Sequence, residues 1–212
     1  MWTPVFPPIC LGCERLLRHD DALALCSRCH PLQARLPDSV AEANGIRALW
    51  SYDGPLSRAV VRLKFSGALA LAGPLGRLLV ADPGVLDGCD RVVSVPLHWR
   101  RRLVRGFDQS EELSRWAVRH ARQTLRSRAP VLARRVLARS RATRPQTQLD
   151  APARAANVEG AFFVRRPEQV RGRRVLLIDD VTTTGATAQA CMHALREAGV
   201  ASVTALALLR AL

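Results

Sequence analysis

The chain has 212 residues, 48% of them hydrophobic, which is enough for one α/β domain with a small attachment. The longest apolar run falls well short of the roughly 20 residues that a membrane span needs, and the first residues carry neither a basic region nor a long apolar stretch. We therefore expect no membrane insertion and no secretory signal, and hence a cytoplasmic protein.

The formal net charge is +14, from 32 basic and 18 acidic residues, and it is unevenly distributed. Residues 91–145 hold 15 Arg and three acids, whereas residues 1–45 hold four Arg and five acids. A basic segment of this kind favours polyanions such as nucleic acid or a phosphorylated small molecule, although a solvated basic surface is the alternative. Only one of the basic residues, Lys64, is a lysine, which is typical of codon bias.

In chain order, the first feature is a pair of cysteine knuckles with the spacing C-x2-C-x12-C-x2-C, formed by Cys10, Cys13, Cys26 and Cys29. This spacing predicts a structural zinc site, because four thiolates complete a tetrahedron and leave no open position. Two disulfides fit poorly with a chain that lacks an export signal, and an iron–sulfur cluster is the lesser metal alternative. We expect residues 1–45 to form this module and residues 46–212 to form the main domain.

Segments with strand character then alternate with segments of helical periodicity, which predicts a parallel sheet with helices on both faces. The expected strands are 46–52, 91–97, 161–166, 174–181 and 200–209. The expected helices are 56–67, 70–81, 109–125 with Ser110 as N-cap, and 186–199 closed by Gly199. Residues 131–139 fit either a short strand or a helix, and residues 140–160 read as a long loop, either a lid or a disordered segment.

The most informative stretch is VLLIDDVTTTGAT, residues 175–187, where an apolar strand ends in Asp179 and Asp180. Backbone N–H groups at the start of the next helix, together with threonine hydroxyls, form an anion site, and Gly185 permits close backbone approach. Two adjacent carboxylates disfavour a phosphate but accept hydrogen bonds from a sugar diol or from a metal-bound water. The pattern therefore predicts a site for a phosphorylated ribose; the alternative is a strand end with a threonine N-cap and two solvated aspartates.

This stretch resembles the phosphoribosyl-pyrophosphate (PRPP) motif of type I phosphoribosyltransferases. With VPLHWRRRLVRGFDQS, RPQTQL, ARAANVEGAF and the cysteine knuckles, the whole chain resembles the ComF family, which is linked to DNA uptake in competent bacteria. The resemblance implies a type I phosphoribosyltransferase-like fold in which Asp179 and Asp180 contact the ribose of PRPP, bound with Mg²⁺. It assigns the 5-phosphate to Thr182, Thr183, Thr184, Gly185, Ala186 and Thr187. Asp108 departs from the family, which usually has Asn there.

The resemblance also implies a pyrophosphate loop after the strand at 91–97 and a flexible lid at 139–157. The residues expected to reach the phosphates from these two segments are His98, Arg100, Arg101, Arg105, Arg144 and Gln148. Guanidinium groups suit this task because their planar donors match phosphate oxygens.

Three functions are compatible with these features. The first is a PRPP-binding protein that also binds single-stranded DNA, with Trp99, Phe107 and Trp116 as candidates for base stacking and competence-machinery proteins as partners. The second is an active phosphoribosyltransferase with an unidentified acceptor; the sequence offers no clear catalytic base, because Thr183 stands where purine-salvage relatives have Asp. The third is a regulatory sensor of PRPP or a nucleotide.

Overall fold

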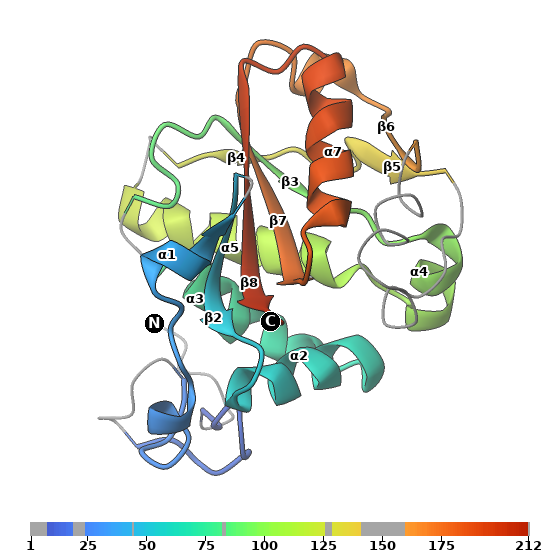
Figure 1. The fold of residues 1–212 in the computed structure, drawn as a ribbon. Coiled ribbons are helices and arrows are strands. Elements are labelled where there is room, and N and C mark those ends of the chain that lie inside the picture. Colours follow the sequence, from blue (N-terminus) through green and yellow to red (C-terminus); the bar gives the residue numbers. More distant parts are fainter. Residues whose placement is uncertain are drawn as a thin grey trace.

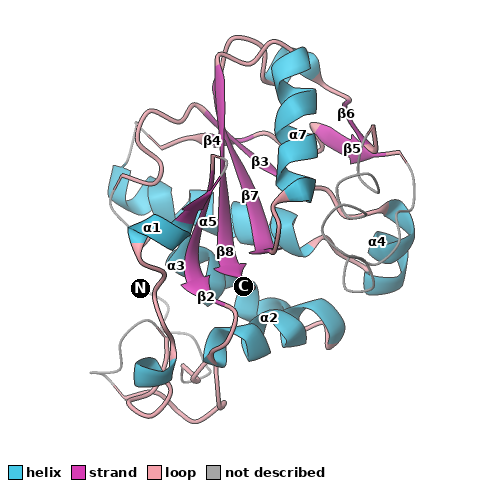
Figure 2. Cartoon of the chain, viewed as in Figure 1, coloured by secondary structure: helices cyan, strands magenta, loops and turns pink. Residues whose placement is uncertain are grey.

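The computed structural model describes residues 8–18, 24–43, 45–81, 84–125, 129–140 and 160–211. The helices there are α1 (Asp38–Ala41), α2 (Pro55–Phe65), α3 (Ala72–Leu79), α4 (Trp99–Arg105), α5 (Gln109–Leu125) and α7 (Ala186–Glu197), with short 3-10 turns at His30–Leu32, Leu69–Leu71 and Pro167–Gln169. The strands are β1 (Glu42–Ala43), β2 (Ile46–Ser51), β3 (Arg91–Ser94), β4 (Val131–Leu132), β5 (Leu137–Arg139), β6 (Phe162–Val164), β7 (Arg174–Thr182) and β8 (Ser202–Arg210). Figures 1 and 2 show their arrangement.

The described part of the chain forms a sheet of order β1-β2-β8-β7-β3-β4, and β5 pairs with β6 in a separate antiparallel hairpin. The strands β2, β8, β7, β3 and β4 run parallel, and only β1 is antiparallel to its neighbour. The expected parallel sheet flanked by helices is therefore confirmed. The central strand β7 ends at the carboxyl edge of the sheet, which is where open α/β folds bind ligands.

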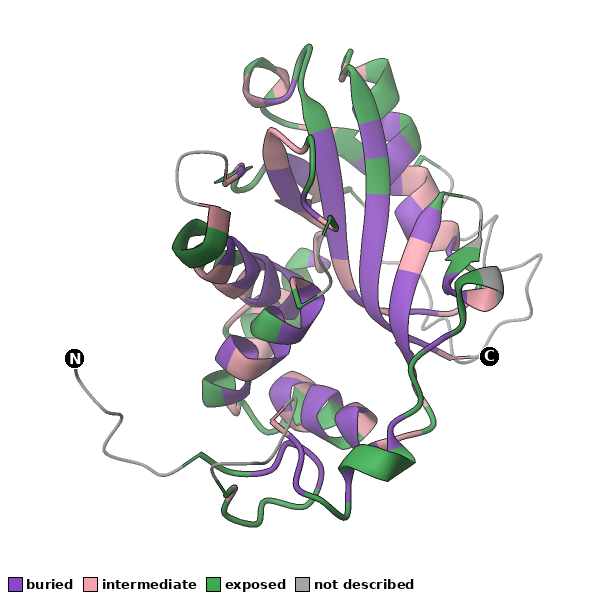
Figure 3. Cartoon of the chain, turned by 90° about the vertical axis from the view of Figure 1, so that its left-hand side faces the viewer, coloured by how far each residue is buried: buried purple, intermediate pink, exposed green. Residues whose placement is uncertain are grey.

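The strand β7 is buried on both faces because its side chains alternate between two apolar clusters. Leu176 and Ile178 pack into the cluster that contains α2, α3 and α5, whereas Val175 and Leu177 pack against α7 and β6. Figure 3 shows the buried central strands between their covering helices. A central parallel strand is apolar at every position for this reason, and the two aspartates at its end are therefore exceptional.

Three local expectations need correction or completion. The segment after β3, expected to be a loop, forms the short helix α4, with His98 at its N-cap accepting a hydrogen bond at Nδ1 from the N–H of Arg100. The helix α5 is capped by Asp108, whose Oδ1 accepts from the backbone N–H groups of Ser110 and Glu111, so Ser110 is not the cap. Residues 131–139 contain the two short strands β4 and β5.

The cysteine knuckles pack on the start of α2. A Cβ placed on Gly12 would lie 2.5 Å from Cβ of Pro55, and Glu14 forms an ion pair of 3.0 Å with Arg62. Leu11 and Leu25 belong to the same apolar cluster as the buried face of α2. The knuckles therefore support the helix that approaches the carboxyl edge of the sheet, while the division of the chain at residue 45 stays a prediction.

No helix within the described segments is both long and apolar enough to cross a membrane.

Candidate functional site

A cavity of about 780 Å³ opens at the carboxyl end of β7. Asp179, Asp180 and Thr187 line it from the strand and the start of α7. The end of α2 lines it with Lys64, Phe65 and the nearby Gly67. The residues contributed by the β3–α5 segment are Val95, Pro96, Leu97, Arg100, Arg101, Val104, Arg105, Gln109 and Ser110. The volume lies in the range of small-molecule sites.

The two carboxylates of the acid pair have different partners. Asp179 accepts at Oδ1 a hydrogen bond of 3.1 Å from Oγ of Ser110 and one of 2.9 Å from the N–H of Asp180. Asp180 accepts at Oδ1 from the N–H of Val181, and its Oδ2 lies 3.0 Å from the ammonium of Lys64. Each carboxylate is thus oriented by a side chain from a different helix, α5 for Asp179 and α2 for Asp180.

The proximity of the two acids changes the charge at the site. Burial, followed by the neighbouring charge of Asp180, raises the pKa of Asp179 to about 7, against the lowering effects of Lys64 and Ser110. Near neutral pH the acid pair therefore carries less than its full formal charge, and Lys64 offsets part of the remainder.

The predicted phosphate-loop residues occupy several environments. Thr182 is buried at the end of β7, where its carbonyl accepts from the N–H of Ala211. Gly185 has φ +81°, and a Cβ there would lie 2.5 Å from Cδ1 of Ile46, so both backbone angle and space require glycine. Of the group expected to hold the 5-phosphate, Thr187 lines the cavity, whereas Thr182, Thr183, Thr184, Gly185 and Ala186 are not among its lining residues. Their part in phosphate binding stays a prediction.

The predicted pyrophosphate residues separate into two groups. Arg100, Arg101 and Arg105 line the cavity, but His98 is buried and caps α4. Burial, and then the charges of nearby arginines, lower the pKa of His98. Such a histidine is suited to capping the helix rather than to holding a phosphate.

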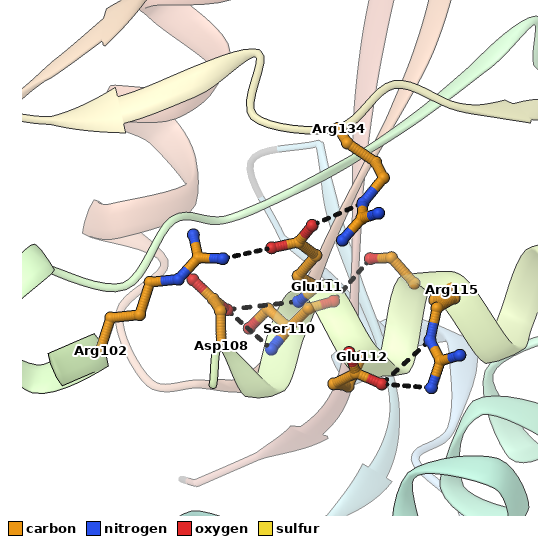
Figure 4. A network of polar contacts seen from close by, with 8 residues as sticks. Arg102, Asp108, Ser110, Glu111, Glu112, Arg115 and Arg134 are labelled. Atoms are coloured by element: carbon orange, nitrogen blue, oxygen red, sulfur yellow. Dashed lines mark hydrogen bonds and ion pairs between the residues drawn. The ribbon is translucent and has the colours of Figure 1, made fainter. Parts of the chain in front are cut away.

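Arg102 is not among the residues that line this cavity, and it contacts Glu111 instead. Glu111 accepts ion pairs of 3.3 Å from Arg102 and 2.8 Å from Arg134, and Figure 4 shows this network around the start of α5. In the same network Asp108 accepts at Oδ2 a 2.7 Å hydrogen bond from the N–H of Leu97. Asp108 therefore joins the loop after β3 to the N-terminus of α5.

Two of the residues expected on the lid, Arg144 and Gln148, lie outside the described residues. Arg139, at the end of β5, does line the cavity, and burial lowers its pKa.

The four N-terminal cysteines come together as predicted. Their sulfur atoms all lie within 4.8 Å of one another, with Sγ of Cys13 and Cys26 3.6 Å apart, and none of them is in a disulfide. Ligands about 2.3 Å from a tetrahedral zinc ion are about 3.8 Å apart, so the cluster has the size of a tetrathiolate site. The backbone N–H of Cys29 contributes most to lowering the pKa of Cys26 to about 6, whereas burial raises the pKa of Cys29 to about 12.

Two site residues were missed by the sequence analysis. Lys64 and Ser110 each contact one carboxylate of the acid pair from a helix distant in sequence. The available signal for Lys64 was that it is the only lysine among 32 basic residues. Ser110 carried no such signal, since its position equally suited a helix cap.

Comparison with known proteins shows which proteins this chain is related to. It is 33% identical over 221 residues to DNA utilization protein YhgH of Escherichia coli strain K12, covering 96% of this chain and 91% of that protein. It is 32% identical over 171 residues to Competence protein F of Haemophilus influenzae, covering 76% and 70% of the two chains. The chain belongs to the ComF family.

The profile of the phosphoribosyl transferase domain matches residues 118–212, which include the acid pair and α7. This ComF protein therefore contains a domain of the type I phosphoribosyltransferase fold beside its four-cysteine cluster.

Two solved structures resemble the ComF chain weakly. One is the allosteric regulatory enzyme of purine biosynthesis, with a TM-score of 0.42 and 22% identity. The other is the glutamine PRPP amidotransferase of B. subtilis complexed with ADP and GMP, with a TM-score of 0.41 and 23% identity. Each match covers 64% of this chain, which spans about a quarter of the length of either enzyme.

Proposed function

We propose that this ComF protein binds PRPP in the cavity at the end of β7. The observation that carries the proposal is that Asp179, Asp180 and Thr187 line the same cavity as Arg100, Arg101 and Arg105. The acid pair accepts hydrogen bonds from the ribose hydroxyls, the start of α7 receives the 5-phosphate, and the arginines bind the pyrophosphate.

Magnesium fits this proposal as an ion carried by the ligand. Asp180 is already paired with Lys64, so the acid pair does not form a dedicated cage of carboxylates for the ion. Mg²⁺ commonly binds through substrate phosphates and retains several waters, and here it would neutralise part of the pyrophosphate charge. Isothermal titration with PRPP, with and without Mg²⁺, tests binding; no heat of binding with Mg²⁺ would refute it.

We also propose that the protein binds single-stranded DNA and acts in DNA uptake, a role supported by the name of the competence relative. The helix α4 exposes Trp99 by 53% and Val104 by 93%, and the guanidinium of Arg100 lies 5.2 Å from the centre of the Trp99 ring. Exposed aromatic rings beside arginines are the usual platform for stacked bases. Phe107 and Trp116 are partly buried and pack against the core, so they are poor candidates for stacking.

Fluorescence anisotropy with a labelled oligothymidine at increasing KCl tests this second activity. We expect an affinity that falls steeply with salt and that decreases about five- to a hundredfold in Trp99→Ala. Phe163→Ala is the matched control, because Phe163 is also exposed and has Arg165 over its ring but lies on β6. Binding that is absent, or equally affected by both variants, would contradict the proposal.

The cysteine cluster supports Zn²⁺ as its structural ion. Cys10, Cys13, Cys26 and Cys29 would hold it in a closed tetrahedron and add folding energy to a small module. Reduced thiolates persist in reducing compartments, which supports the prediction of a cytoplasmic location.

Turnover is a separate question, and the alternatives of an active transferase or a regulatory sensor are distinguished by one assay. Release of pyrophosphate from PRPP, measured with a panel of acceptors, is expected only of the transferase. Binding of PRPP without release across the panel favours the sensor.

A further inference from the structure

The end of α2 places a lysine at the acid pair. The Nζ atom of Lys64 lies 3.0 Å from Oδ2 of Asp180, with 21% of the lysine side chain and 5% of the aspartate side chain exposed. Both residues line the 780 Å³ cavity. Helix α2 is held by its buried face, which includes Leu56 and Leu63, and by the cysteine module at its start. The ammonium is therefore presented to the cavity from a fixed helix.

The Lys64 ammonium and the two carboxylates can together form the hydrogen bonds that a sugar hydroxyl requires. An ammonium has three donors, and although Lys64 forms an ion pair with Asp180, Oδ2 of Asp180 is a buried acceptor without a hydrogen-bond partner among the described residues. Asp179 accepts through Oδ1 from Ser110 and from the backbone, and its carboxylate oxygens have further lone pairs for a ligand hydroxyl. A hydroxyl donates once and accepts through two lone pairs, so one hydroxyl can donate to Asp180 while it accepts from Lys64.

We propose that Lys64 is a further ligand-binding residue of the ribose site, and this inference rests on the proposed PRPP binding. Its ammonium donates to the oxygen of one sugar hydroxyl, and that hydroxyl donates to Asp180. The second hydroxyl of the cis-diol donates to Oδ2 of Asp179. The three side chains thus recognise the diol directly.

Two consequences follow from the charge and the geometry. First, recognition of the diol does not require a divalent cation, because Lys64 already compensates one of the two carboxylates. Removing Lys64 should therefore increase the affinity of the acid pair for a free divalent cation. Second, a sugar without the 2-hydroxyl leaves a donor or acceptor unpaired in a partly buried site, and this lowers the affinity for that sugar.

The second consequence separates the two proposed ligands. The sugar of DNA lacks the 2-hydroxyl, and its internal 3-hydroxyls are esterified, so it cannot satisfy Lys64, Asp179 and Asp180 together. Single-stranded DNA therefore does not occupy the diol contacts themselves, although its proposed platform at Trp99 shares Arg100 and Val104 with the cavity.

The test uses ribose 5-phosphate and 2-deoxyribose 5-phosphate as probes in EDTA, titrated into the wild-type protein, Lys64→Met, Lys64→Arg and Arg62→Met. We expect the wild type to prefer the ribose compound by about tenfold or more, and Lys64→Met to lose most of that preference. Lys64→Arg should restore part of it. Arg62→Met is the matched control, since Arg62 lies on the same helix but pairs with Glu14 outside the cavity.

A second readout is Mn²⁺ binding followed by electron paramagnetic resonance in the absence of sugar. Lys64→Met should bind Mn²⁺ at least severalfold more tightly than the wild type does. Unchanged Mn²⁺ affinity, or an unchanged preference for ribose in Lys64→Met, would overturn the inference and leave Lys64 as a structural ion pair. An equal loss of affinity for both sugars in this variant would do the same.

The outcomes also separate this inference from the proposed function. If the wild type binds PRPP with Mg²⁺ but not ribose 5-phosphate in EDTA, PRPP binding stands and metal-independent recognition of the diol is wrong. If it binds neither PRPP nor ribose 5-phosphate, the proposed function is wrong, and the Mn²⁺ titration alone still decides whether Lys64 compensates the acid pair.

Discussion

Ser110 donates a hydrogen bond of 3.1 Å from its Oγ to Oδ1 of Asp179, across 69 positions of sequence. Ser110 is in the first turn of α5 and only 1% exposed, and Asp179 is near the end of β7. The contact fixes one carboxylate of the acid pair to the same helix end that Asp108 caps. The geometry of the proposed ribose site thus depends on a helix that begins just after the proposed pyrophosphate loop.

Replacing this serine tests whether the orientation of Asp179 matters for binding. We expect Ser110→Ala to weaken PRPP binding about three- to tenfold, because one hydrogen bond that orients the carboxyl group of Asp179 is lost. Ser114→Ala is the matched control: Ser114 is also buried in α5, but its Oγ donates to the carbonyl of Ser110. Equal affinity of the two variants for PRPP, measured calorimetrically, would show that the contact with Asp179 has no role in binding.

The raised pKa of Asp179 predicts a pH dependence of stability. The native carboxyl titrates at about 7, whereas an aspartate in the unfolded chain titrates near 3.9. Between these values the native state holds the extra proton, so the free energy of unfolding should fall as pH rises from about 4 to about 7. Urea unfolding from pH 5 to 8 measures the slope. Asp179→Asn should flatten it, and an identical slope in that variant would contradict the assignment.

Asp108 is expected to stabilise the loop and α5 together. Asp108→Ala removes the acceptor for the N–H groups of Leu97, Ser110 and Glu111, and should lower the free energy of unfolding by about 1–3 kcal/mol. Asp108→Asn keeps one acceptor and should cost less. The exposed Asp87 offers the control variant Asp87→Ala, and chemical denaturation compares the three. A cost for Asp108→Ala no greater than that of the control would argue against this role.

The cysteine cluster predicts that the exposed residue Cys13 is important for stability. Cys13 is exposed, and an exposed residue normally tolerates substitution, yet Cys13→Ser should lower the melting temperature and the metal content if it is a ligand. Cys89→Ser is the control, because Cys89 lies outside the cluster. Metal analysis by mass spectrometry and thermal unfolding are the measurements. A Cys13→Ser protein that retains one metal ion and its melting temperature would exclude a four-thiolate site.

Much of the fold could be predicted from the chain because its signals are local. The apolar run of β7 and the helical periodicity of α2, α5 and α7 can each be read from the residues of the segment itself. These patterns mark the side chains that become buried in the fold. Gly199, with φ +80°, closes α7 as expected. The helix α4 was missed, because its seven residues contain four arginines and bury none of their side chains, so they show no amphipathic period.

The site was only partly predictable for a physical reason. Asp179 and Asp180 are recognisable because two like charges rarely end a buried strand, but their partners lie on other elements. Lys64 and Ser110 reach them from α2 and α5, and only the packing of these helices over the sheet edge brings the groups together. His98 had a suitable side chain for chemistry, yet its burial at the N-cap of α4 could not be read from sequence.

The central claim is that the acid pair holds the ribose of PRPP. Isothermal titration of PRPP with Mg²⁺ into the wild-type protein and into the double variant Asp179→Asn, Asp180→Asn tests it most directly. We predict saturable one-site binding to the wild type and a loss of about a hundredfold or more in the variant, whose fold is verified by circular dichroism. Equal binding to both proteins, or no binding to the wild type, would contradict the account.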